Sequence, residues 1–336
     1  MSIKTFDYIV ECIRPEFNLN TTNFQVPIPV EERLLLTLRY LATGMAFRQL
    51  ALSFRISKSA VAQIVIDVCK AIWCTLKNKH MPTPTVEKFK KIANEFYEKW
   101  DFPNCVGSVD GKHIRIKCPK NSGSMFYNYK QYFSTVLMAV ADARYRFTMI
   151  NVGAYGKDSD GSILCNTNFH QRLENGTLKL PTETKLPNSE ISAPYVFVGD
   201  EAFPLRNYLM RPFPRKQTQE TNKSYFNYRL SRARMIVECA FGIASSKFRI
   251  LLKAIETNVE NADHVVKAIC ILHNVIIDCE KHGSSNQKST NTQSETNLNN
   301  SQLMGINPRS KSNNRASRTA IQIRNSFVQF FQESRI

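Results

Sequence analysis

The sequence lacks the features that mark membrane, secreted and nucleotide-hydrolysing proteins. It has no uninterrupted run of about 18 apolar residues, and its charge-interrupted start lacks a signal-peptide core. Its nine cysteines are odd in number and form no CxxC pair, which argues against a disulfide scaffold and favours a reducing compartment. Neither a GxxxxGKS/T phosphate loop nor a GxSxG nucleophile motif is present, so neither ATP dependence nor serine hydrolysis is indicated.

Acidic residues are scarce relative to basic ones. The 336 residues include 45 Lys or Arg against 28 Asp or Glu, which gives a formal net charge of +17. With 43% hydrophobic and 10% aromatic residues, the chain can bury a real core, and its length suits about two domains. Such an excess of positive charge on a folded chain predicts a polyanionic partner, with nucleic acid as the first candidate.

The N-terminal third is predicted to be helical. We expect a helical segment over 1–28, a helix-turn-helix-like DNA-binding region over 29–80 and a linker helix over 81–104. Within the second region, Ser57 can cap a third helix that presents Lys58, Ser59 and Gln63 to a DNA groove. The alternative is an ordinary helical bundle with a solvated face.

The character of the sequence changes after Asn104, where alternating apolar and polar residues predict strands. We expect the order β-β-β-α-β-α-α over 105–280, in an α/β or α+β layered domain. Residues 281–318 are almost wholly Ser, Asn, Thr, Gln and basic residues, which predicts a disordered basic tail. An apolar stripe in 319–336 predicts an amphipathic helix that docks on the body or on a partner.

Three acidic residues stand in apolar contexts. Asp110 lies within a predicted strand, Asp200 ends an apolar strand, and Glu238 lies among apolar neighbours on a predicted helix. A buried carboxylate is unfavourable unless it is paired or bound to a metal, and Arg234 is a candidate partner one turn before Glu238. Three such acids suit a site for Mg²⁺ or Mn²⁺, the ions that phosphodiester hydrolysis uses in pairs.

Basic residues dominate the segment from Pro204 to Lys253, which has eleven Lys or Arg and two acids. Arg232 and Arg234 belong to this segment and are candidate DNA-binding residues. Basic residues neutralise phosphates and aromatic rings stack on bases, so the interleaved aromatic residues favour DNA binding. The interleaved aromatic residues are Tyr208, Phe213, Tyr225, Phe226 and Tyr228. We expect about half of them to lie in the core instead of on a DNA-binding surface.

Four sequence blocks resemble the signature blocks of PIF/Harbinger transposases and of the Harbinger transposase-derived nucleases. In chain order they are GSVDGKHIRI, VGAYGKDSDGSIL, YVFVGDEAFPL and FNYRLSRARMIVECAFG. The N-terminal EERLLLTLRYLATG…FRQLALSFRISKSAV is similar to the family's helix-turn-helix, and the resemblance extends to ICILHN and IRNSFVQFF. It covers nearly the whole chain apart from the polar tail.

The resemblance implies an RNase H-like catalytic domain, with a mixed sheet and flanking helices, and a DDE triad of Asp110, Asp200 and Glu238. Asp110 would bridge two divalent metal ions, Mg²⁺ or Mn²⁺, while Asp200 would complete one metal site and Glu238 the other. The family often carries Asp160 as well, as an auxiliary acid, although a helix N-cap is the role we favour. His113 is common in the block and is expected to be structural or to contact the substrate.

Two patterns fit this scheme less directly. Lys112 stands where many relatives have Thr, and it is expected either to contact phosphate or to weaken metal binding. A CxxH…CxxH pattern raises the alternative of a zinc site, which we disfavour because only five residues separate the pairs and the first pair lies on an apolar helix. Its residues are Cys270, His273, Cys279 and His282.

The sequence therefore predicts a metal-dependent DNA endonuclease or transposase that hydrolyses phosphodiester bonds. The alternative is a non-catalytic DNA-binding or adaptor protein that keeps the transposase fold. In either case the resemblance implies a Myb/SANT-like DNA-binding partner, because the family's elements encode one separately. We expect a nuclear location from this function and leave an additional cytoplasmic one open. We expect no membrane association and leave a homo-oligomer open.

Overall fold

The computed structural model describes residues 1–17, 27–218, 220–281 and 316–334. Almost all of the tail predicted to be disordered lies outside these residues. The helices are α1 (Ile3–Ile13), α2 (Val30–Thr43), α3 (Phe47–Phe54), α4 (Lys58–His80), α5 (Val86–Trp100), α6 (Asp160–Cys165), α7 (Asn168–Glu174), α8 (Thr221–Lys247), α9 (Val259–Lys281) and α10 (Arg318–Glu333). The strands are β1 (Cys105–Arg115), β2 (Ser134–Ala141), β3 (Phe147–Tyr155), β4 (Thr184–Lys185), β5 (Ser192–Ala193), β6 (Val196–Val198) and β7 (Leu209–Met210).

The larger sheet is mixed, with strand order β3-β2-β1-β6-β7. The first three strands are antiparallel neighbours, whereas β6 runs parallel to β1 and β7 runs parallel to β6. Every residue of β2 is buried, as expected for a strand with helices on both faces of its sheet. The prediction of a mixed sheet with flanking helices is confirmed.

Alternation along the strands divides the sheet into two faces. Leu137, Ala139 and Ala141 of β2 belong to one hydrophobic cluster with the buried residues of α8 and α9. Val136, Met138 and Val140 belong to a second cluster, with Ile163 and Leu164 of α6. The sheet therefore lies between the long helices α8 and α9 and the short helices α6 and α7.

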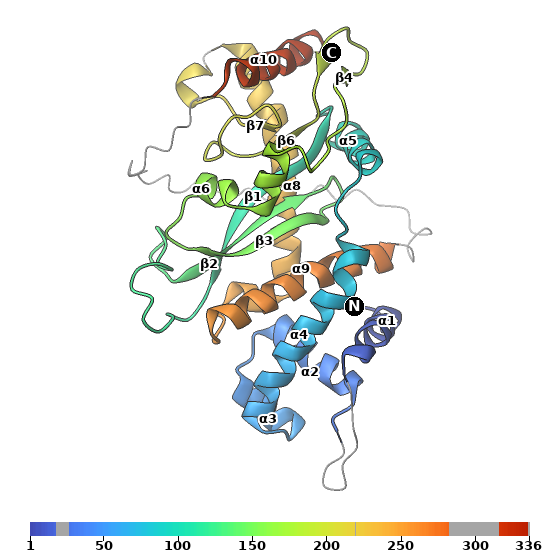
Figure 1. The fold of residues 1–336 in the computed structure, drawn as a ribbon, viewed down its shortest axis with the longest axis vertical. Coiled ribbons are helices and arrows are strands. Elements are labelled where there is room, and N and C mark those ends of the chain that lie inside the picture. The colour runs from blue at the N-terminus through green and yellow to red at the C-terminus, as the bar shows by residue number, and fades with distance from the viewer. Residues whose placement is uncertain (18–26, 219, 282–315, 335–336) are drawn as a thin grey trace.

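Helices α1 to α4 pack at the end of the molecule where α9 crosses beneath the sheet (Figure 1). Ser57 caps α4 by accepting a hydrogen bond from the amide of Ala60 at 3.2 Å. Among the described residues, α4 is the helix that is long and apolar enough to cross a membrane, and half of its most apolar stretch is buried inside the protein. Since α4 packs along α9 and α2, these residues serve as core here. The helix-turn-helix interpretation of α2 to α4 stays a prediction.

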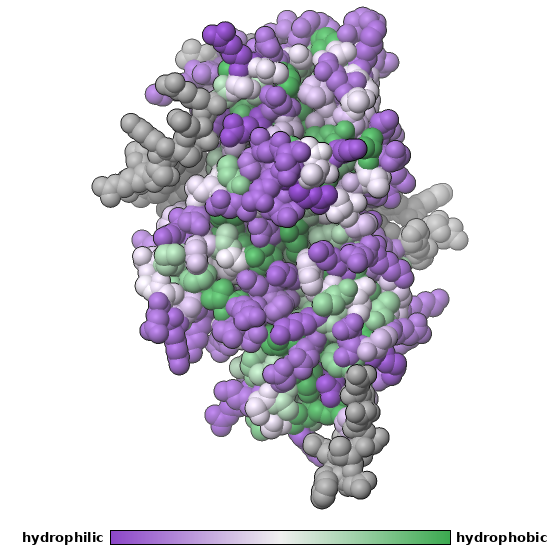
Figure 2. Space-filling model, viewed as in Figure 1, coloured by the Kyte–Doolittle hydropathy of each residue, from purple (hydrophilic) through white to green (hydrophobic). Residues whose placement is uncertain are grey.

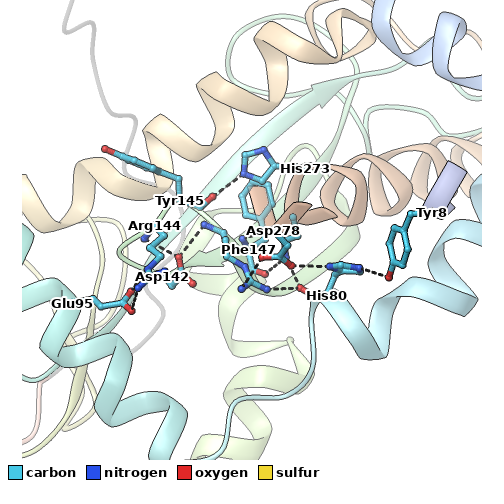
Figure 3. A network of polar contacts seen from close by, with 11 residues as sticks. Tyr8, His80, Glu95, Asp142, Arg144, Tyr145, Phe147, His273 and Asp278 are labelled. Carbon is cyan, nitrogen blue, oxygen red and sulfur yellow. Dashed lines mark hydrogen bonds and ion pairs between the residues drawn. The ribbon is translucent and has the colours of Figure 1, made fainter. Parts of the chain in front are cut away.

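A polar network joins the helical end to the sheet (Figure 3). His80, at the end of α4, contacts the Tyr8 hydroxyl at 2.9 Å and the Asp278 carboxylate of α9 at 2.7 Å. The Asn274 side chain, also on α9, donates to the carbonyls of His80 at 2.9 Å and of Phe147 at 2.7 Å. Helix α4 ends at His80 and β1 begins at Cys105, and one hydrophobic cluster continues across both positions. The domain boundaries predicted there stay predictions.

The chain ends with α10, which packs on α8 at the opposite end of the molecule (Figure 1). Phe327 is fully buried, with its ring 5.5 Å from that of Phe102. The helix predicted over 319–336 is therefore docked on the body. The face of the molecule shown in Figure 2 is mainly hydrophilic, with small hydrophobic areas scattered over it.

The predicted order of elements is close to the observed one. The structure adds α7, the small β4-β5 ladder and the short strand β7, which the predicted order lacks. Of the aromatic residues in the basic segment, Phe213 and Phe226 are buried in the core and Tyr228 is exposed.

Candidate active site

The parallel register between β1 and β6 brings Asp110 and Asp200 to the same level of the sheet. The last pair in this register is Ser108 with Val198, and each aspartate comes two residues later. Because side chains repeat their orientation every second residue, Asp110 lies on the face of Ser108, which is the face covered by α8. The Asp200 carboxylate accepts a hydrogen bond from the Ala202 amide at 2.9 Å, which fixes the turn after β6.

Asp160, in the first turn of α6, is packed against β1. A Cβ atom added to Gly111 would lie 2.3 Å from Oδ1 of Asp160. A Cβ atom added to Gly161 would lie 2.9 Å from the carbonyl oxygen of Ala202. The start of α6 therefore contacts both the strand that carries Asp110 and the turn that carries Asp200. The predicted N-cap role of Asp160 is wrong, because Ser159 caps α6 and accepts a hydrogen bond from the Ser162 amide.

Glu238 reaches the same region from α8. The hydroxyl of Ser108 donates to the backbone carbonyl of Arg234 at 2.8 Å, which joins α8 to β1 one turn before Glu238. Arg234 and Glu238 form an ion pair, as the i, i+4 spacing predicts. The expectation that Glu238 is surrounded by apolar side chains is wrong: its neighbours Ile236 and Val237 face the core, whereas Glu238 is on the exposed side of α8.

The carboxyl groups of Asp160, Asp200 and Glu238 all act electrostatically on Asp110, and we call these four residues the acid cluster. Burial, with repulsion from the other three acids, raises the pKa of Asp110 to about 7. Burial and the charge of Asp200 raise the pKa of Asp160 to about 6. The pKa of Asp200 is raised by burial, against the attraction of Arg234. Buried carboxyl groups whose pKa values are raised by neighbouring like charges are typical of functional sites.

The donor set of the acid cluster consists of carboxylate oxygens, which hard divalent cations such as Mg²⁺ prefer. No group of three or more His, Cys, Asp or Glu side chains in the part of the chain that the structure describes is already arranged as a metal site. Arg234 pairs with Glu238 in this arrangement, so its cation neutralises one of the four acids. The ligand chemistry of the acid cluster therefore fits a divalent metal.

Lys112 and His113 follow Asp110 on β1 and have different surroundings. The Lys112 ammonium lies 5.7 Å from the centre of the Phe241 ring, and burial lowers its pKa. The His113 Nδ1 atom lies 2.9 Å from the hydroxyl of Ser134, and burial lowers the pKa of His113 to about 4. His113 is therefore neutral near pH 7 and serves as a hydrogen-bonding residue of the sheet.

The predicted DNA-binding residues lie in two separate places. Lys58, Ser59 and Gln63 are exposed at the start of α4, where Gln63 donates to Asp67 at 2.8 Å. Arg232 lies on α8, the helix that carries Glu238, and pairs with Asp101 at 2.8 Å. The structure thus does not bring the α4 residues together with the acid cluster.

The CxxH…CxxH pattern has a structural role where it is described. Cys270 and His273 are buried on α9, and His273 Nε2 lies 2.8 Å from the carbonyl oxygen of Tyr145. His282 lies outside the described residues. Nothing in the described part of this pattern supports zinc.

Sequence reasoning missed Lys130, in the loop between β1 and β2. Its positive charge contributes to lowering the pKa values of Asp160, Lys112 and His113, so it lies close to the acid cluster. The alternation of aromatic and polar residues in YNYKQYF, around Lys130, is the signal that could have identified this loop.

Comparisons with known proteins agree with this site. Residues 109–274 match the family described as DDE superfamily endonuclease. The chain is 29% identical over 289 residues to "Protein ALP1-like" of Arabidopsis thaliana, which covers 83% of this chain and 70% of the relative. It is 24% identical over 276 residues to "Putative nuclease HARBI1" of Homo sapiens, which covers 81% of this chain and 74% of the relative.

No solved structure matches the chain. The family match begins one residue before Asp110 and contains Asp160, Asp200 and Glu238, so the whole acid cluster lies inside it. The relatives extend the similarity to most of the chain. The chain therefore carries a DDE superfamily endonuclease domain over residues 109–274, and most of its length is similar to the ALP1-like protein and to the putative nuclease HARBI1.

Proposed function

We propose that this protein is a metal-dependent DNA endonuclease of the PIF/Harbinger type, with the acid cluster as its active site. The observation that carries the proposal is the convergence of four carboxyl groups from β1, β6, α6 and α8 within the DDE domain. The mixed sheet, with three antiparallel strands followed by two parallel ones, supports the RNase H-like fold that the resemblance implies.

In this proposal Asp110, Asp200 and Glu238 hold divalent metal, and Asp160 is an auxiliary acid. Two bound Mg²⁺ or Mn²⁺ ions would supply an activated water and stabilise the leaving oxygen of the phosphodiester. The protein's part is to position the carboxylates. Asp160 is held against Gly111, and Arg234 pairs with Glu238 while its charge also attracts Asp200.

The substrate is bound by basic residues around the cluster and at the helical end. Lys112 shares the face of Asp110, and Arg232 lies on the same helix as Glu238. At the helical end, Lys58 lines a pocket of about 350 Å³ together with Arg48, Lys117 and Lys253. Basic side chains grouped in this way suit the phosphate backbone of DNA, which supports a DNA-binding role for the region of α2 to α4.

A second function is favoured by one observation, the ion pair of Arg234 with Glu238. This pair satisfies the third acid of the triad without metal. In this alternative the protein is a DNA-binding or adaptor protein that keeps the transposase fold. Both functions place the protein in the nucleus with a Myb/SANT-like DNA-binding partner, and both are compatible with a homo-oligomer.

Replacement of Asp200 by Asn tests the proposal. The amide keeps the shape of the carboxyl group and its acceptor oxygen for the Ala202 amide, but it removes the charge that binds metal. We expect metal-dependent cleavage to fall by at least about 100-fold, with DNA affinity within about twofold of wild type.

The matched control is Asp263→Asn. Asp263 is a half-buried aspartate of α9 whose carboxylate accepts from Thr135 at 3.3 Å, and burial raises its pKa to about 6. It lies outside the acid cluster, so this variant should cleave like wild type. Full cleavage by Asp200→Asn would overturn the proposal, as would an equal loss in both variants.

A further inference from the structure

The loop that joins β1 to β2, residues 116–133, is rich in basic and aromatic residues. It contains Lys117, Lys120 and Lys130 and no acidic residue. Among the aromatic side chains that the structure describes, the exposed ones are Tyr127, Tyr129, Tyr155 and Tyr228. Two of these lie in the loop, and Tyr155 packs its ring 5.1 Å from that of Phe126, also in the loop. In Figure 1 the loop projects from the end of the sheet near the β2 label.

The tip of this loop is held in place by buried hydrogen bonds. Asn128 is 3% exposed, and its side-chain oxygen accepts from the amides of Lys130 at 2.9 Å and Tyr132 at 3.2 Å. Its side-chain nitrogen donates to the hydroxyl of Ser134 at 2.9 Å, which in turn contacts His113 on β1. The loop tip is therefore joined to the strand that carries Asp110.

The side chains of Tyr129 and Lys130, next to Asn128, face solvent. Tyr129 is 78% exposed, although its ring stands edge-on to His113 with centres 5.5 Å apart. The Lys130 ammonium lies 5.4 Å from the centre of the Tyr129 ring. An exposed aromatic ring beside a cation suits a nucleotide, because the base can stack on the ring while its phosphate pairs with the cation.

This pair of side chains lies close to the acid cluster. His113, which contacts the Tyr129 ring, is three residues from Asp110 on β1. Lys130 acts electrostatically on Asp160 and on Lys112. A nucleotide held by Tyr129 and Lys130 would therefore lie next to the acid cluster.

We propose that Tyr129 and Lys130 bind an unpaired nucleotide of the DNA next to the bond to be cut, with the base stacked on Tyr129 and a phosphate bound by Lys130. This inference rests on the proposed function, since it names the form of DNA that the active site takes. It makes a duplex with an unpaired or displaced base the preferred substrate over a fully paired duplex. The competing hypothesis is that the same surface binds a protein.

The experiment measures binding of the full chain, without divalent metal, to two oligonucleotide duplexes. One duplex carries a single unpaired 2-aminopurine, a fluorescent adenine analogue that stacking quenches, and the other is fully paired. The variants are Tyr129→Ala, Tyr129→Phe and Lys130→Ala. The control is Tyr127→Ala, which removes a tyrosine from the same loop whose ring packs 5.2 Å from Phe133.

We expect Tyr129→Ala to weaken binding to the unpaired duplex about 10-fold and to abolish the quenching, with an effect below about twofold on the paired duplex. Tyr129→Phe should bind like wild type. Lys130→Ala should reduce the slope of log affinity against log salt by about one for the unpaired duplex.

Equal binding by wild type and Tyr129→Ala, with unchanged quenching, would overturn the inference. An equal loss in Tyr127→Ala would also overturn it, because the effect would then come from the loop's structure. A preference of the wild type for the paired duplex would also overturn the inference and would favour a protein as the ligand of this surface. Since no cleavage is measured, loss of the proposed nuclease activity would be detected separately, by the Asp200→Asn comparison.

Discussion

At the scale of single residues, Gly111 shows how closely the acid cluster is built. The Asp160 carboxylate occupies the space where a side chain of Gly111 would be, with Oδ1 only 2.3 Å from a Cβ atom at that position. Either the strand or the carboxylate must move if any other residue stands there. The position therefore couples the backbone beside Asp110 to the placement of Asp160.

We predict that Gly111→Ala lowers the rate of metal-dependent DNA cleavage about 10- to 100-fold, because a displacement of about 1 Å at a catalytic site has effects of this size. The control is Gly242→Ala on α8, where an added Cβ meets nothing within 4 Å. That change should leave cleavage unaltered and stabilise the protein by about 0.5–1 kcal/mol. Unimpaired cleavage by Gly111→Ala would contradict the described packing of Asp160.

The raised pKa of Asp110 predicts how stability depends on pH in the absence of metal. The folded protein holds the proton of Asp110 up to about pH 7, whereas an unfolded aspartate loses it near pH 3.9. The contribution of Asp110 to the free energy of unfolding should therefore fall by an amount on the order of 2–4 kcal/mol as the pH rises from about 4 to 7.

Asp110→Asn removes this dependence, so the variant should be more stable than wild type at pH 8 without metal and show a flatter profile between pH 4 and 7. Urea titrations at a series of pH values measure it. Parallel profiles for the two proteins would show that Asp110 ionises as it does in the unfolded chain.

For the residues of the acid cluster, the sequence identified the residues more reliably than it predicted the role of each one. Asp110 and Asp200 could be singled out because Asp110 lies in an apolar strand and Asp200 closely follows another, and the structure brings those strands side by side. The N-cap role of Asp160 was wrong because Ser159, one residue earlier, has the same capping capacity. The exposure of Glu238 could not be read from its immediate neighbours, since a helix turns by about 100° per residue and adjacent residues face different ways.

At the scale of elements, α10 depends on a sequence-distant partner. Phe327 is fully buried, and Phe331 packs its ring 5.3 Å from that of Phe102, which follows α5. The apolar stripe of α10 predicts a helix, but the surface it covers is formed by residues far earlier in the chain. The small β4-β5 ladder was missed for a related reason, because two-residue strands carry too little alternation to be recognised.

We predict that Phe327→Ala lowers the free energy of unfolding by about 3–5 kcal/mol, the usual result of emptying the site of a buried phenylalanine. Ile321→Ala on the same helix, where the side chain is 40% exposed, should cost less than about 1 kcal/mol. Guanidinium titrations of the three proteins make the comparison. A loss below about 1 kcal/mol for Phe327→Ala would show that α10 is not docked as described.

At the scale of the whole molecule, the helical end and the DDE domain form one body. The hydrophobic cluster that begins with Ile9 of α1 continues through α4 and α9 to β2, and the network around His80 crosses the same junction (Figure 3). Composition and periodicity predict the helices and the sheet separately, whereas this junction depends on contacts between residues nearly 200 positions apart, such as His80 with Asn274. The arrangement holds the basic pocket around Lys58 in a fixed relation to the sheet.

The most direct measurement is a plasmid nicking assay in Mg²⁺ or Mn²⁺ that compares wild type with Asp110→Ala, each with and without a Myb/SANT-like partner. We predict that wild type nicks the plasmid only when the metal is present, and that Asp110→Ala does not nick it but still binds DNA. Equal nicking by both proteins would contradict the role of the acid cluster. No nicking under any condition, with DNA binding retained, would contradict the nuclease proposal and favour the DNA-binding adaptor.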